Sequence, residues 1–279
     1  LEGHKWLPGL GKCRYPAKVR KVMTEYGKLM AMESVGCEIR FHTEAQNVRV
    51  HLNAVSGSPL VWVYRGDLWN ATFHLEQGKI SCLSVIKPDF SKYKQEHLNK
   101  GAFSPDIWRF IVSGGHVAFC SVETFGHSLR APKPLEKPKK KWLAYGSSIT
   151  HADLYGYIHV ATRILGVDLF NKGMGGSCFC EKETADYIAD DCEWDFVTLE
   201  LGVNMRNSIE PTEFAKRAEY IVKKIISRAD GKPLILINIF PNGNDALKIP
   251  DKVSETQNKY REIIRNIARI NKSKNTYLI

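Results

Sequence analysis

The chain contains 279 residues, of which 43% are hydrophobic and 25% are charged, and its formal net charge is +10. Such proportions are typical of a folded soluble protein and exclude a disordered chain, while the length suits two domains of ordinary size. No run approaches the roughly 18 apolar residues that a membrane-spanning helix needs, so no membrane partner is expected. The chain has a positive net charge but no nucleic-acid-binding motif, so nucleic acid is not an expected partner either.

Cysteine usage bears on location and on metal binding. The chain has seven cysteines, an odd number that excludes complete internal pairing. Cys178 and Cys180 form C-x-C rather than the C-x-x-C of zinc and redox sites, so we expect buried thiols, no metal and no cofactor. Free thiols suit a reducing compartment, and the first residues lack the apolar core of a signal peptide, although the chain does not begin with Met. The expected location is cytoplasmic.

Residues 1–131 predict a β-rich domain. Short runs in this region either alternate apolar with polar residues or are wholly apolar, and turn residues separate them, including a hairpin turn expected at Arg65-Gly66-Asp67. Strands are predicted at residues 38–42, 48–52, 60–64, 71–75, 80–86, 108–112 and 116–122. Strands at this spacing, with no clear amphipathic helix between them, favour a β-sandwich of the jelly-roll kind.

Residues 132–141 contain three prolines and five lysines and predict an extended, solvated linker. Beyond the linker, apolar strands alternate with amphipathic helices, so residues 142–279 predict a parallel sheet covered on both faces. The strands are expected at 142–145, 167–170, 196–201, 234–240 and 276–279. Helices are expected at 157–165, from Pro211 to a stop at Gly231, and after a capping box formed by Ser254 and Gln257.

The loops after the first three of these strands predict a catalytic site, because sites in parallel sheets form at the carboxyl ends of the strands. The loops contain Gly146-Ser147-Ser148, a glycine-rich run at 171–176, and Gly202-Val203-Asn204. A hydroxyl beside free backbone N–H groups and an amide is the layout of acyl transfer through an oxyanion. Taken alone, each loop has another interpretation: a helix start with a serine N-cap, a phosphate-binding loop, and a turn asparagine.

The three loops in this order resemble the sequence blocks of the SGNH (GDSL-type) hydrolases, with Ser147 where Asp is common and Met205 where a further Asp is usual. The stretches 142–151 and 199–206 also resemble a bacterial branch of these enzymes. That branch joins an N-terminal β-sandwich to a flavodoxin-like three-layer α/β/α hydrolase domain, as the second carbohydrate-esterase family does. The resemblance therefore covers nearly the whole chain.

The resemblance implies an activity and the residues that perform it. Ser148 would be the nucleophile, and the Ser148 N–H, the Gly176 N–H and the Asn204 side chain would form the oxyanion hole. The implied reaction is ester hydrolysis, with an acetyl ester on a carbohydrate as the expected substrate class. The implied partner is thus a small-molecule or carbohydrate ester, while the oligomeric state stays open.

A serine nucleophile needs a base, which the resemblance supplies as a histidine in an Asp-x-x-His block after the fifth strand. No histidine follows His159 in the chain, so we expect that block beyond Ile279. His151, three residues after Ser148, is the alternative general base, although a helical side chain there tends to point away from the hydroxyl.

Two rival functions stay open at this point. The first is a non-catalytic carbohydrate-binding protein that uses the sandwich and an inert hydrolase-like cleft. Sugar stacking on Trp62, Trp69 and Trp108 would suit it, although we expect these rings to pack in the sandwich core. The second is transfer of the acyl group to a sugar, which sequence does not separate from hydrolysis.

Overall fold

The computed structural model describes residues 14–279, which form two compact units. Among these residues, the first unit comprises 14–15, Ala31–Lys140 and Asp153–Leu169, and the second comprises Pro16–Met30, Lys141–Ala152 and Phe170–Ile279. The units therefore interleave along the sequence, although the main change from one to the other falls at the end of the Lys/Pro-rich stretch.

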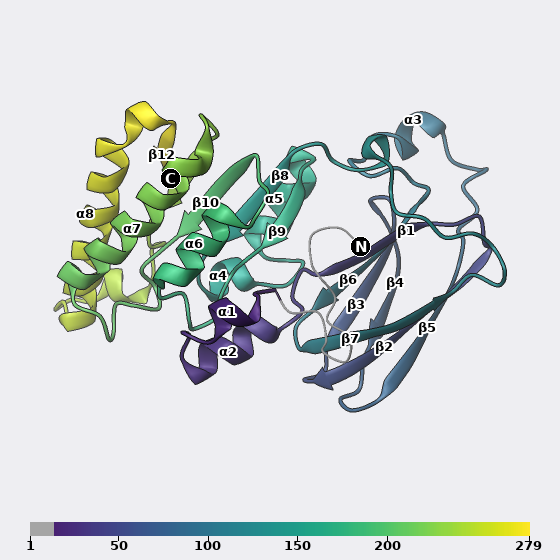
Figure 1. Ribbon diagram of the computed structural model, residues 1–279, viewed down its shortest axis with the longest axis horizontal. Coiled ribbons are helices and arrows are strands. Elements are labelled where there is room, and N and C mark those ends of the chain that lie inside the picture. Colours follow the sequence, from purple (N-terminus) through teal and green to yellow (C-terminus); the bar gives the residue numbers. More distant parts are fainter. Residues whose placement is uncertain (1–13) are drawn as a thin grey trace. The chain divides into compact units, whose positions relative to one another are not determined.

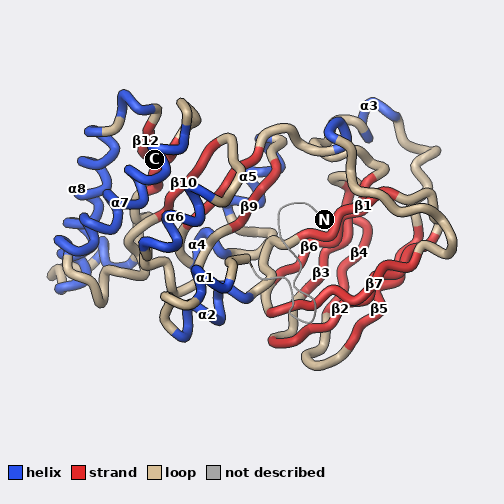
Figure 2. The backbone as a smooth tube through the Cα atoms, viewed as in Figure 1, coloured by secondary structure: helices blue, strands red, loops and turns tan. Residues whose placement is uncertain are grey.

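The first unit contains two antiparallel sheets, which are visible in Figures 1 and 2. Their strand orders are β1-β6-β3-β4 and β5-β2-β7. The strands are β1 (Glu38–His42), β2 (Asn47–Ser56), β3 (Leu60–Arg65), β4 (Leu68–His74), β5 (Ile80–Ile86), β6 (Ile107–Ser113) and β7 (His116–Glu123). All seven strands predicted here are confirmed. Inward side chains from both sheets, such as Val50 and Phe110, belong to one hydrophobic cluster.

The details of this unit both confirm and correct the sequence analysis. Gly66 forms the expected turn between β3 and β4 with a φ of +57°. Trp108 is fully buried as expected, whereas Trp69 is 62% exposed, so the core assignment of Trp69 is wrong. The Lys/Pro-rich stretch includes a short 3-10 helix, η1 (Pro134–Glu136), which Arg130 fixes by an ion pair to Glu136 at 2.7 Å.

Three helices within residues 14–131 were not predicted, and only one of them lies between strands. They are α1 (Ala17–Arg20), α2 (Glu25–Met32) and α3 (Gln95–Leu98). Two of them are only four residues long, and α2 has eight residues, including Gly27. Segments this short do not develop the repeated apolar face on which a sequence-based helix prediction depends.

The parallel sheet has the strand order β12-β11-β10-β8-β9 (Figure 1). Numbered along the chain within this sheet, the order is 2-1-3-4-5, the order of flavodoxin-like doubly wound folds. The strands are β8 (Lys141–Tyr145), β9 (Asp168–Asn171), β10 (Phe196–Glu200), β11 (Leu234–Ile237) and β12 (Thr276–Leu278). The five strands and their parallel pairing were expected, although β11 ends earlier than predicted.

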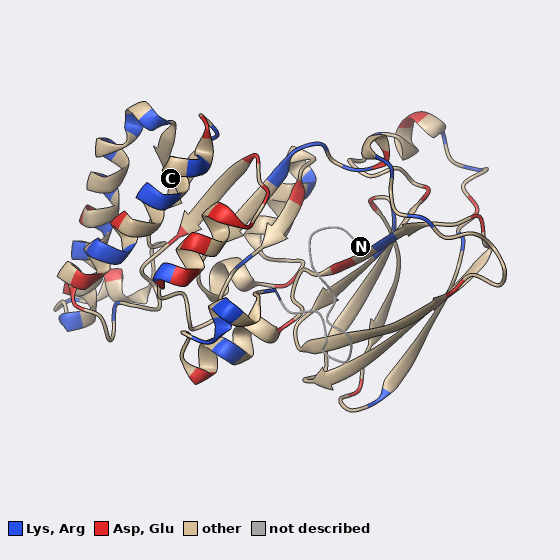
Figure 3. Ribbon diagram, viewed as in Figure 1, with Lys and Arg blue, Asp and Glu red and all other residues tan. Residues whose placement is uncertain are grey.

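The helices after Lys141 are α4 (Ser148–His151), α5 (Tyr157–Leu165), α6 (Lys182–Asp190), α7 (Pro211–Ala229) and α8 (Lys252–Ile270), of which α5 belongs to the first unit. Helix α6 was missed. The capping box predicted from Ser254 and Gln257 is wrong, because Asp251 is the N-cap and accepts a hydrogen bond from the Ser254 N–H at 2.7 Å. Lys and Arg mix with Asp and Glu along α6, α7 and α8 (Figure 3), as on solvated helix faces.

Candidate active site

Ser148 is the first residue of α4, directly after β8, and the tight turn before it requires Gly146. A Cβ on Gly146 would lie 2.7 Å from Glu200 Oε2, closer than Cβ atoms approach other atoms. Ser147 is the N-cap of α4, because its Oγ accepts a hydrogen bond from the Ile149 N–H at 3.2 Å. Helix capping thus involves Ser147 and leaves the Ser148 hydroxyl uncommitted. We call residues 146–150 the serine turn.

Glu200, the last residue of β10, is fully buried against the serine turn. Its Oε2 accepts hydrogen bonds from the Ser147 N–H (2.7 Å), the Ser147 Oγ (2.7 Å) and the Thr150 Oγ1 (3.2 Å). Burial raises the pKa of Glu200, and these donors offset only part of that shift. Oε1 has no partner among the residues that the structure describes. The serine turn is therefore held by a carboxylate whose hydrogen-bond donors are all neutral.

Ser148 itself is exposed. Neither its hydroxyl nor its backbone N–H has a hydrogen-bond partner within residues 14–279. A serine whose hydroxyl and N–H are both free at the carboxyl end of a parallel strand can attack a bound carbonyl and then hydrogen-bond to its oxygen.

The loop after β9 runs directly beside the serine turn. The Met174 N–H donates to the Gly146 carbonyl at 2.7 Å. A Cβ on Gly173 would lie 2.3 Å from the backbone nitrogen of His151, so the close approach of this loop to α4 requires glycine. Gly176 has a φ of +64°, in the left-handed region that glycine adopts without strain. The Gly176 N–H has no hydrogen-bond partner in the described part of the chain.

Asn204 lies in the loop after β10, and its two amide atoms have different environments. Oδ1 accepts a hydrogen bond from the Cys178 N–H at 3.1 Å, which orients the amide and ties this loop to the loop after β9. Nδ2 has no partner among residues 14–279. The structure thus brings together the loops of Ser148, Gly176 and Asn204, which follow the three neighbouring strands β8, β9 and β10.

The thiols of Cys178 and Cys180 are buried, as expected, since each residue is 1% exposed. Burial raises the pKa of Cys178 well above its ordinary value, which leaves its thiol protonated and unreactive. The described residues contain no group of His, Cys, Asp and Glu side chains that could hold a metal ion. The cysteines therefore pack the loop, and the backbone N–H of Cys178 orients Asn204.

His151, the alternative general base, is 9% exposed in α4. A Cβ on Gly175 would lie 2.8 Å from its Nδ1, so the imidazole packs closely against the loop after β9. It is the only histidine in the second unit. His159 belongs to the first unit, where burial lowers its pKa to about 4 and keeps it neutral.

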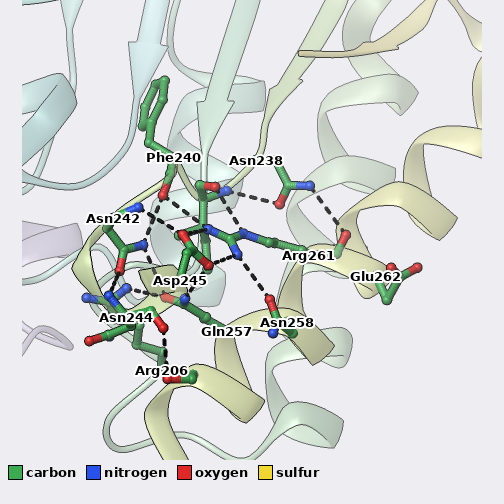
Figure 4. Close-up of polar contacts among 12 residues, drawn as sticks. Arg206, Asn238, Phe240, Asn242, Asn244, Asp245, Gln257, Asn258, Arg261 and Glu262 are labelled. Atoms are coloured by element: carbon green, nitrogen blue, oxygen red, sulfur yellow. Dashed lines mark hydrogen bonds and ion pairs between the residues drawn. The ribbon is translucent and has the colours of Figure 1, made fainter. Parts of the chain in front are cut away.

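Figure 4 shows a polar network that sequence analysis missed, on the loop after β11 and on α8. Arg261 binds both oxygens of Asp245, at 2.5 and 2.8 Å. Gln257 donates to Asp245 at 2.9 Å and accepts from Arg206 at 2.6 Å. Since Arg206 lies two residues after Asn204, the network ties the Asn204 loop to the neighbouring loop of the sheet. The fully buried Gln257 is thus part of this network rather than a capping residue.

No protein-family model and no curated protein matches the sequence. Solved structures do match it. The salicylyl-acyltransferase SsfX3 from a tetracycline biosynthetic pathway has a TM-score of 0.76 at 16% identity, covering 100% of this chain and 80% of that one. A putative GDSL-like lipase from Bacteroides ovatus has a TM-score of 0.65 at 17% identity, covering 96% and 80%. A family two carbohydrate esterase from Clostridium thermocellum, in complex with cellohexaose, has a TM-score of 0.59 at 12% identity, covering 88% and 82%.

These likenesses show the fold. The chain has the SGNH (GDSL-type) hydrolase fold, similar to that of the family two carbohydrate esterases, as its sequence blocks indicated. Within residues 14–279, no helix is both long and apolar enough to cross a bilayer.

Proposed function

We propose that this protein is a serine esterase in which Ser148 is the nucleophile and the Ser148 N–H, the Gly176 N–H and the Asn204 amide form the oxyanion hole. The observation that carries this proposal is the set of uncommitted groups on three adjoining loops. One hydroxyl and three N–H donors lack hydrogen-bond partners among the described residues, while their neighbours Ser147, Met174 and Cys178 are bonded. Donors left free at one edge of a sheet are available to developing negative charge.

The proposed reaction has two steps. A base takes the Ser148 hydroxyl proton as Oγ bonds to the ester carbonyl carbon, and the carbonyl oxygen becomes the oxyanion. Collapse of this intermediate breaks the ester C–O bond, and the leaving alcohol takes the proton from the base. Water then attacks the acyl-enzyme by the same route, releasing the acid and restoring Ser148.

The base in this proposal is a histidine. The resemblance places it in an Asp-x-x-His block after the fifth strand, which is β12. His151 is the alternative, and its close packing against Gly175 favours a structural role instead. His151→Asn tests this alternative: loss of activity comparable to that of Ser148→Ala assigns the base to His151, and retained activity excludes it.

We propose an acetyl ester on a carbohydrate as the substrate class. We also propose that the two antiparallel sheets of the first unit, which share one core, are the β-sandwich domain found in the family two carbohydrate esterases. Support comes from the similarity to carbohydrate esterases, one of them in complex with cellohexaose. The similarity to a salicylyl-acyltransferase favours a second candidate, transfer of the acyl group to an acceptor hydroxyl. Product analysis with an acetylated donor and a sugar acceptor distinguishes released acetate from acetylated acceptor.

Turnover of p-nitrophenyl acetate tests the nucleophile. Ser148→Ala should lower kcat at least about 1,000-fold, because removal of the attacking hydroxyl abolishes the covalent step. Ser208→Ala is the matched control, since Ser208 is an exposed serine near the same edge of the sheet. Wild-type turnover that persists in Ser148→Ala would exclude this mechanism, and glycan binding without any turnover would support an inert carbohydrate-binding cleft instead.

A further inference from the structure

Burying the carboxylate of Glu200 at this position costs folding free energy. It is fully buried, one of its oxygens is unpartnered among the described residues, and the donors to the other oxygen are all neutral. An apolar residue at the end of a buried strand would avoid the cost of desolvating a carboxylate. The hydrogen bonds of its side chain to the described residues all come from the serine turn, so its effect is concentrated there.

We propose that Ser147 and Glu200 are a matched pair of positioning residues that orient the proposed nucleophile, Ser148. This inference rests on the proposed function. Ser147 directs both its N–H and its hydroxyl at Glu200 Oε2, each at 2.7 Å. That arrangement commits the Ser147 N–H to the protein interior and leaves the next N–H along the chain, that of Ser148, without an internal acceptor.

The pair explains why Ser147 stands where the related sequence block commonly has Asp. A serine hydroxyl can donate to a carboxylate, whereas an ionised Asp is only an acceptor. Asp at position 147 would therefore place a second carboxylate within hydrogen-bond distance of Glu200, and two like charges in a buried site repel each other strongly. A chain with Glu200 thus requires a donor at position 147.

Among the described residues, no positive charge beside Glu200 would offset that repulsion. The serine turn covers it from one side, where a Cβ on Gly146 would already lie 2.7 Å from Oε2. The Sγ of Cys178 lies 3.8 Å from the backbone carbonyl oxygen of Glu200, and burial raises the pKa of this thiol, so it adds no positive charge there. Among residues 14–279, Glu200 forms no ion pair with a Lys, Arg or His.

The rate at which a fluorophosphonate acylates Ser148 tests the pair through a compensating change. We expect Ser147→Asp to lower this rate about 100-fold, because a small displacement of a reacting group costs about that much. Glu200→Gln should stay within about 10-fold of wild type, since the amide oxygen accepts the same three hydrogen bonds. Combining the two changes should restore most of the loss, because the amide introduced at position 200 can donate to the new carboxylate.

Thr198→Val is the matched control. Thr198 lies on the same strand and accepts a buried hydrogen bond from Trp142 Nε1 at 2.9 Å. Among residues 14–279, no side-chain hydrogen bond joins it to the serine turn. Its variant should be less stable and acylate at the wild-type rate. A Ser147→Asp variant that acylates at the wild-type rate, or a double variant no faster than Ser147→Asp alone, would overturn the pairing.

Hydrogen exchange of the amides of residues 146–151 gives a readout that needs no activity. Exchange should be at least about 10-fold faster in Ser147→Asp and return toward the wild-type rate in the double variant, because the Ser147 N–H is protected only when its acceptor is in place. If wild type is not acylated but the exchange pattern holds, the proposed function fails and the pairing stands. If exchange is unchanged in Ser147→Asp, the pairing fails.

Discussion

Two glutamates with little exposure, the half-buried Glu38 in the first unit and the fully buried Glu200 in the second, have opposite kinds of partner. Glu38 accepts hydrogen bonds from Arg40 Nε at 2.7 Å and from Arg109 Nε and NH2 at 3.0 and 2.9 Å. Burial alone would raise the pKa of Glu38, but the two arginines hold it far below its ordinary value. For Glu200, burial prevails over its neutral donors and raises the pKa.

The two carboxylates have different roles: Glu38 stabilises the fold, whereas Glu200 positions the proposed active site. Around Glu38 the charges balance, because Arg40 also binds Asp168 at 2.6 and 2.8 Å and Arg109 binds Asp67 at 2.7 Å. Around Glu200 no opposite charge offsets the burial, and its donors belong to the turn of the proposed nucleophile. We therefore expect substitution of Glu38 to lower the unfolding free energy, and substitution of Glu200 to affect the position of the serine turn.

The largest expected effect on stability is that of Glu38→Leu. Removing this carboxylate leaves the buried Arg109 and the half-buried Arg40 with one anionic partner fewer each, which should cost about 3 kcal/mol of unfolding free energy. Urea unfolding measures this loss. Turnover per folded molecule should stay at the wild-type level, and a parallel fall in kcat would show that the ion cluster also shapes the site.

A smaller effect is expected from Thr150→Val, which removes the Thr150 hydroxyl as a donor to Glu200. The lost hydrogen bond should lower the unfolding free energy by about 1 kcal/mol, and kcat should fall less than about 10-fold because both Ser147 donors remain. The measurement combines urea unfolding with turnover of p-nitrophenyl acetate. A larger kinetic effect than that of Ser147→Asp would place the orienting contact on Thr150 instead.

Glu200→Gln should change the unfolding free energy at neutral pH by less than about 1 kcal/mol, because the amide oxygen keeps the three hydrogen bonds and the buried charge disappears. Glu38→Gln should cost clearly more, because both arginines lose a charged partner. The two isosteric substitutions are thus a direct contrast, measured by the same unfolding experiment. Equal losses would remove the distinction between the two carboxylates.

The smallest expected effect is a pH dependence of opposite sign for these two variants. Glu38 has a lowered pKa, so its stabilisation is present above the ordinary value of 4.5 and is lost as the pH falls below it. Glu200 has a raised pKa, so it destabilises the fold increasingly as the pH rises from 4.5 through its folded value. Between pH 4 and pH 7, Glu200→Gln should gain stability relative to wild type, whereas Glu38→Gln should gain none. Urea unfolding at both pH values measures the two trends.

The sequence predicted the strands and the order of the three loops well, because apolar runs and glycine turns are local signals. It missed Glu200 and Gln257, whose partners lie up to 53 residues away in the chain. A signal for Glu200 was nevertheless present, since it is a charged residue within the apolar run at 196–201. Helix α6 was missed because its buried positions include small or polar residues such as Thr184 and Ala185.

The most direct test of the central claim is the site of covalent modification by a fluorophosphonate, mapped by peptide mass spectrometry. Ser147 and Ser148 are adjacent, yet only Ser148 has an uncommitted hydroxyl, so they serve as an internal comparison. We expect one adduct per chain, on Ser148, and none in Ser148→Ala. An adduct on Ser147, or equal labelling of wild type and Ser148→Ala, would contradict it.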